Sequence, residues 1–209
     1  MGLFDGIGRA FGLARDHIET GAELAAFMDS RAAFLAQKCV VEFCRVRAGV
    51  YWQKLFSEND FQRELSRSRW RSYPAAYGMI AEMVEGALRV HAGVQRLEVP
   101  DRLAALAAGT FAQYPVPEGE SDAFWHDAEA LVRETLAKAR GAPARPVREI
   151  PKPLARKVFD ALPLHKDIVT NDYDYIFNNL RMNLLRAHEE LVASAAPEPL
   201  LADLLGDRG

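Results

Sequence analysis

The stretch TNDYDYIFNNLRMNLLRAHEEL, residues 170–191, is apolar at helical spacing and unusually rich in asparagine and aspartate. Apolar side chains that recur every three or four positions give a helix one continuous apolar face. The residues on this predicted face are Tyr173, Phe177, Leu180, Leu184 and Leu191. Asparagine and aspartate are mediocre helix formers, so a helix retains them for their side chains or tolerates them at its surface. The spacing therefore predicts a long helix with one polar side.

A second long helix is predicted from Thr20 to Phe56. Thr20 and Glu23 match a capping box, in which two side chains satisfy free backbone amides at a helix start, and Ser57 with Asp60 marks the next start. The apolar positions between these two starts are Leu24, Met28, Leu35, Cys39, Phe43, Val46 and Val50. Such a stripe indicates a central, largely buried helix.

The rest of the chain also favours helices. A short helix is predicted near residues 61–65, and Pro74 is expected to open another that ends before Pro100. Two further helices are predicted around residues 103–111 and 121–136, and no strand-like alternation or internal repeat is evident. We therefore predict an all-α fold, a single irregular helical bundle built around the two long helices.

The prolines and glycine of residues 141–153 are unfavourable for a helix or a central strand. This interval is predicted to be an extended connection over the surface. The predicted organisation is an amphipathic helix at residues 1–19, a helical core at 20–140, the connection, and C-terminal helices at 154–209 that pack on the same core. The C-terminal part alone is too small to fold securely.

Composition limits the class of function. The 209 residues carry a net charge of −3 and have the balance of an ordinary globular protein, so we do not expect nucleic acid as a partner. No apolar run reaches the roughly 20 residues that span a bilayer, and no secretion signal opens the chain. Reducing conditions suit Cys39 and Cys44, which lie within one predicted helix. We expect a cytoplasmic protein, and peripheral membrane contact stays open.

The predicted N-terminal helix is amphipathic. Phe4, Ile7 and Phe11 fall on one of its sides. The opening residues 2–5 are similar to short membrane-active peptides. Docking on the protein's own core or on a neighbouring subunit is the favoured alternative, because only two arginines are available for anionic lipid.

Residues 63–73 interleave guanidinium groups with aromatic rings. The candidate contact residues are Arg67, Arg69, Trp70, Arg71 and Tyr73. This chemistry suits carboxylates, phosphates or a protein hot spot, while the alternative is a solvated helix end with Trp70 packed inward. Our leading hypothesis is a non-enzymatic interaction or assembly protein that acts through this patch and the N-terminal helix. Its expected partner is another protein or a second copy, with no cofactor.

The alternative hypothesis is a helical-bundle enzyme or small-molecule binder with a polar pocket. Its candidate ligand-binding residues are Glu42, Arg45, Asp174, Asn178, Arg181 and His188. His188 would be the acid or base, because histidine titrates near neutrality. A structural hydrogen-bond network is the other explanation of these side chains. No catalytic constellation is recognisable, and paired Glu-x-x-His motifs are missing, so no metal site is expected.

Overall fold

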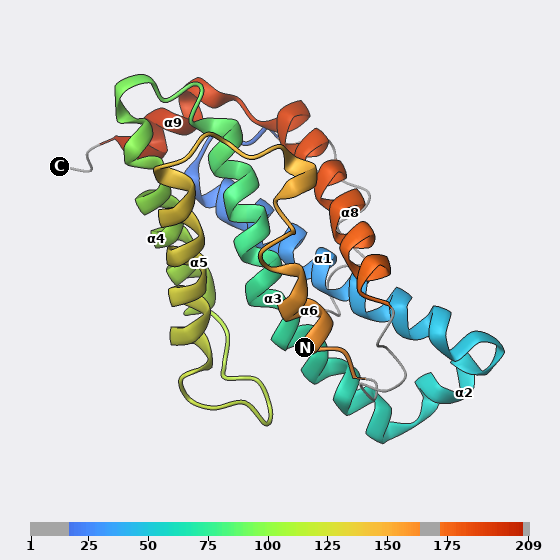
Figure 1. The fold of residues 1–209 in the computed structure, drawn as a ribbon. Helices are drawn as coiled ribbons and strands as arrows, with labels where there is room; N and C mark the ends of the chain where they lie inside the picture. Colours follow the sequence, from blue (N-terminus) through green and yellow to red (C-terminus); the bar gives the residue numbers. More distant parts are fainter. Residues whose placement is uncertain (1–16, 164–171, 207–209) are drawn as a thin grey trace.

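The computed structural model describes residues 17–163 and 172–206, and this part of the chain is all-α (Figure 1). The long helices are α1 (Gly21–Ala48), α3 (Asn59–Leu88) and α8 (Tyr173–Ser194). The shorter helices are α2 (Trp52–Ser57), α4 (Val99–Phe111), α5 (Phe124–Arg140), α6 (Ala155–Asp160) and α9 (Pro197–Leu205). The predicted all-α class is confirmed.

The helices α1 and α3 form an antiparallel pair at the centre of the molecule (Figure 1). Helices α4 and α5 pack together on one side of α3, whereas α6 and α8 pack on the other. Helix α9 is joined to the start of α1, where the Gly21 amide donates to Asp203 Oδ2 at 2.7 Å. Buried apolar side chains from Ile18 to Leu205 form one hydrophobic cluster.

Helix α3 is the central helix, and residues 72–85 are all buried. The prediction that Pro74 opens a helix is wrong, because Pro74 lies inside α3. The short helix predicted near residues 61–65 is the first part of the same helix. Proline inside a helix costs about 3 kcal/mol, but each fully buried large apolar side chain contributes about 1.5–3 kcal/mol. Burial on every side therefore outweighs the local preference.

Helix α1 begins as predicted and ends earlier. The Glu23 amide donates to Thr20 Oγ1 at 3.2 Å and the Thr20 amide donates to Glu23 Oε2 at 3.0 Å, so the capping box is confirmed. The predicted single helix from Thr20 to Phe56 is wrong. Gly49, with φ 52°, ends α1, and the chain turns through the 3-10 segment η2 (Gly49–Tyr51) into α2. Glycine reaches this backbone region without a Cβ clash.

The chain before α1 differs from the predicted helix of residues 1–19 in its last part. Ile18 forms an isolated parallel bridge with Ala195, in which the Ile18 amide donates to the Ser194 carbonyl oxygen at 2.9 Å. Residues 1–16 lie outside the described residues. The C-terminal part of the chain is therefore tied to the start of the helical core by backbone hydrogen bonds.

The proline-rich connection of residues 141–153 is fastened to α3. It runs without regular structure over residues 143–146, forms the short 3-10 segment η4 (Val147–Glu149), and continues through hydrogen-bonded turns, so the predicted extended connection is wrong for its second half. Its Arg145 donates from Nε to the buried Glu82 at 2.6 Å. Arg89 of α3 donates to the carbonyl oxygens of Ala139 at 2.8 Å and Ala142 at 2.7 Å. The connection therefore closes over α3.

We expect Gly49→Ala to lower the free energy of unfolding by about 1–2 kcal/mol, because an L residue is strained at this backbone conformation. Space is not the cause, since a Cβ at Gly49 would meet nothing within 4 Å. Gly109→Ala is the matched control, because that position in α4 is equally open. The control is expected to gain about 0.5–1 kcal/mol. Urea unfolding followed by circular dichroism measures both, and an unchanged Gly49→Ala would contradict the assignment.

Candidate interaction surfaces

The aromatic residues of the run 63–73 belong to the core. Tyr73 is fully buried and Trp70 is partly buried, with 6.0 Å between their ring centroids. The Tyr73 hydroxyl donates to Asp29 Oδ1 at 2.5 Å, and the Tyr114 hydroxyl donates to Asp29 Oδ2 at 2.6 Å. Rings of Tyr77, Phe111 and Trp125 surround Tyr73. The prediction that Tyr73 contacts a partner is therefore wrong.

The arginines of the same run hold the loop between α4 and α5. Arg71 Nε donates to Glu120 of this loop at 2.7 Å. Arg67 pairs with Glu64 at 2.7 Å. It also packs on Gly119, where an added Cβ would lie 2.5 Å from its guanidinium. Arg69 is partly buried. These contacts give the predicted patch a structural role.

Exposed apolar side chains with basic residues beside them in the sequence lie where α1 passes into α2. We call residues 45–56 the hairpin tip. It projects beyond the neighbouring helices in Figure 1. Val46, Val50 and Tyr51 are 57%, 87% and 73% exposed. The prediction that Val46 and Val50 belong to a buried stripe is wrong, because both side chains are exposed: Val50 lies beyond the end of α1 at Ala48, and Val46 lies in its last turn.

The base of the hairpin tip is packed. Leu55 and Phe56 lie against the core, and the Phe56 and Phe61 ring centroids are 5.2 Å apart. The Trp52 ring meets Phe56 edge-on at 6.0 Å, and the Arg45 guanidinium lies 5.0 Å from the Trp52 ring centroid. These successive ring contacts hold the apex in place, and its apolar side chains are exposed to solvent.

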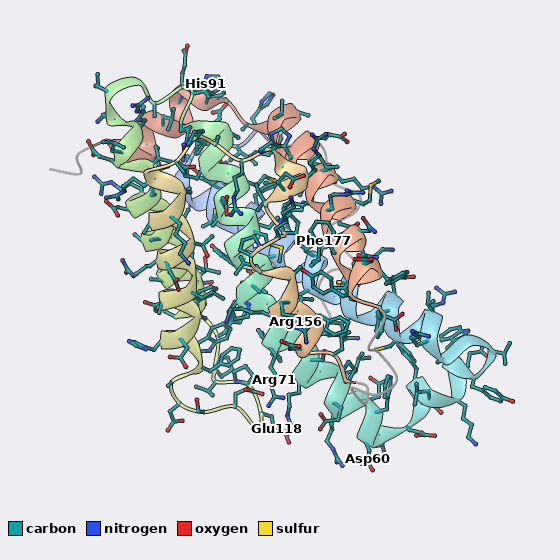
Figure 2. All side chains as sticks on the ribbon, in the orientation of Figure 1. Asp60, Arg71, His91, Glu118, Arg156 and Phe177 are labelled. Carbon is teal, nitrogen blue, oxygen red and sulfur yellow. The ribbon has the colours of Figure 1, made fainter. Side chains whose placement is uncertain are left out.

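A second exposed apolar patch lies at the opposite end of the molecule, beside His91 (Figure 2). Its members are Val90, Val94 and Leu97, between α3 and α4. This patch contains no aromatic residue in positions 89–98. The two patches resemble each other in exposure and differ in side-chain chemistry, which makes the second a control for the first.

The polar residues proposed for a ligand pocket are spread over the outer surfaces of α1 and α8. Arg45, Asp174 and Asn178 are exposed, and Glu42, Arg181 and His188 are partly exposed. Arg181 lies over the Phe177 ring at 6.0 Å, and Glu42 pairs with Lys38 at 3.6 Å. None of the six is buried.

The buried cysteines are unsuited to nucleophilic chemistry. Cys39 and Cys44 are free and fully buried, and burial raises the pKa of each thiol to about 12. A thiol with this pKa stays protonated at neutral pH, whereas the thiolate is the reactive form. Among residues 17–163 and 172–206, no group of three or more His, Cys, Asp or Glu could hold a metal ion.

The N-terminal candidates Phe4, Ile7 and Phe11 lie outside the described residues. In the part of the chain that the structure describes, no helix is both long and apolar enough to cross a bilayer. Comparison with protein-family models, with curated proteins and with solved structures finds no match. A function must therefore be argued from the surfaces of this molecule.

We expect Tyr73→Phe to lower the free energy of unfolding by about 1–3 kcal/mol, because it leaves a partly buried Asp29 oxygen without its donor. Tyr114→Phe is the matched control, since it removes the other hydrogen bond from a half-exposed ring that water can reach. Its expected loss is smaller. Urea unfolding compares the two, and equal losses would contradict a buried role for Tyr73.

The raised thiol pKa values predict alkaline sensitivity. Unfolded cysteine titrates near pH ~8.5, so the unfolded chain releases protons before the folded chain does. Stability is complete below that pH and falls until the folded thiols titrate at about 12. The expected loss from pH ~8.5 to ~9.5 is about 1 kcal/mol for each thiol, and the slope approaches about 1.4 kcal/mol per pH unit at higher pH. The difference in unfolding free energy between pH ~8.5 and ~9.5 is measured for the natural chain and for Cys39→Ala/Cys44→Ala. Equal slopes would contradict the prediction.

Proposed function

We propose that the protein is a non-enzymatic helical interaction protein and that the hairpin tip is its docking surface. The observation that carries the proposal is the exposure of Val50 and Tyr51 at the apex of a projecting helical turn. Water-exposed apolar side chains that cluster on one surface mark interaction sites. Tyrosine, tryptophan and arginine, which dominate the energetics of interfaces, are all present at the tip.

The construction of the tip supports a role in binding. Its base is fixed by the contacts of Leu55, Phe56 and Trp52, so the apex needs little ordering when it docks. A surface that is already ordered loses less conformational entropy on association. The apex also adds little to the core, because its apolar side chains face solvent. These side chains are therefore accessible to a partner.

The predicted amphipathic segment with Phe4, Ile7 and Phe11 remains part of this proposal as a second surface. A binding role is favoured over catalysis because the candidate polar residues around His188 are spread over a surface and the thiols are protonated. We place the interaction in the cytoplasm, where Cys39 and Cys44 remain reduced.

The proposal predicts that Val46→Ser/Val50→Ser/Tyr51→Ser changes association and not folding. The free energy of unfolding is expected to change by less than about 0.5 kcal/mol, because the replaced side chains are exposed. A photoreactive amino acid at position 50 is expected to form adducts in cells, with protein or with lipid, that mass spectrometry identifies. The same amino acid at position 94 is the matched control, because Val94 is also exposed.

Adducts at position 50 in clear excess over position 94 would support the tip as the docking surface. Equal yields at the two positions, or no adduct at position 50, would contradict it. A loss of folding stability in the triple variant would also contradict it, because the tip would then be part of the fold.

A further inference from the structure

We propose that the hairpin tip docks on an anionic lipid surface, a proposal that rests on the proposed function and names its partner. The first observation is charge. Residues 43–57 carry three cations and no acidic residue, although the whole chain has a net charge of −3. Arg45 and Lys54 are exposed, and Arg47 shares its charge with Asp172. Basic residues beside an apolar surface are attracted to anionic headgroups.

The second observation is the combination of side chains at the tip. Val46, Val50 and Tyr51 form the exposed apolar apex, and Trp52 follows directly behind it with partial exposure. Arg45 lies over the Trp52 ring, so a cation and an indole lie next to the apolar side chains. A lipid surface offers acyl chains, then the interface that tyrosine and tryptophan prefer, then charged headgroups. The tip combines the same three kinds of side chain on one turn.

The third observation is the small size of the apex. Stable protein interfaces bury about 800 Å² on each partner, which is more than a few side chains supply. The tip is convex and ends in three exposed apolar residues (Figure 1). A deformable lipid surface can accept such a projection, and electrostatic attraction supplements the shallow insertion. The cytoplasmic leaflet is the anionic one, which agrees with the proposed compartment.

The patch at Val90, Val94 and Leu97 provides the contrast within the same molecule. It has comparable apolar exposure, but it lacks aromatic residues and is bordered by Glu98. Arg89, which follows α3, is bonded to the Glu85 carboxylate, and Arg96 is exposed within the patch. If exposure alone caused membrane binding, both patches would bind. If a cation beside aromatic rings is also required, only the tip will bind.

The test is sedimentation of the full chain with vesicles of phosphatidylcholine alone and of phosphatidylcholine mixed with phosphatidylserine. We expect binding to the mixed vesicles only, weakened by added salt. Arg45→Gln/Lys54→Gln is expected to lower the partition coefficient by about 25-fold, since each cation near an anionic surface contributes roughly fivefold. Val50→Ser/Tyr51→Ser is expected to weaken binding at least tenfold, on the order of the transfer of two apolar side chains. The control Val90→Ser/Val94→Ser is expected to bind like the natural chain.

Failure of the mixed vesicles to bind would overturn the lipid inference. Binding that survives the tip variants and is lost in Phe4→Ser/Phe11→Ser would also overturn it, by assigning the contact to the N-terminal segment. If vesicles fail to bind while position 50 still forms protein adducts in cells, the lipid inference fails and the proposed docking role stands. If position 50 forms no adduct and vesicles fail to bind, both fail.

Discussion

The burial of α3 on all sides is the constraint on which the rest of the structure depends. Residues 72–85 leave no face of the helix to solvent, and the segment includes the carboxylates of Glu82 and Glu85. A buried charge that loses its partner destabilises a protein by about 3–5 kcal/mol. Glu85 is bonded to Arg89 one turn further along the helix, and Glu82 to Arg145 of the proline-rich connection. The fold must therefore bring the connection back across α3.

A third carboxylate, that of Asp29, binds the middle of α3 at Tyr73. Asp29 of α1 accepts hydrogen bonds from Tyr73 of α3 and from Tyr114, which follows α4. Three parts of the chain that are distant in sequence meet at this group. Burial raises the pKa of the Tyr73 hydroxyl far above its ordinary value, and the nearby Asp29 charge acts in the same direction, so the phenol stays protonated as a donor.

The sequence was sufficient for features that depend on neighbouring residues. Thr20 and Glu23 define a helix start by local hydrogen bonding, and the periodicity of residues 173–191 is a property of one helix. It was insufficient at Pro74, where burial by other helices decides the conformation. Val46 and Val50 follow the same spacing whether or not another helix covers them. The spacing of Trp70 and Tyr73 does place them on one side of a helix, a signal that could have separated them from the exposed Arg71.

The distribution of charge between the tip and the rest of the chain would orient the molecule at an anionic surface. The tip carries three cations, so acidic residues outnumber basic ones over the remainder of the chain by more than the net charge of −3 indicates. An anionic surface would attract the tip and repel the body, which orients the molecule before contact. Two copies approaching through their tips would instead bring Arg45 and Lys54 of each chain together. Like charges oppose that association, whereas an anionic surface neutralises them. The basic residues that would keep two tips apart therefore favour a lipid partner.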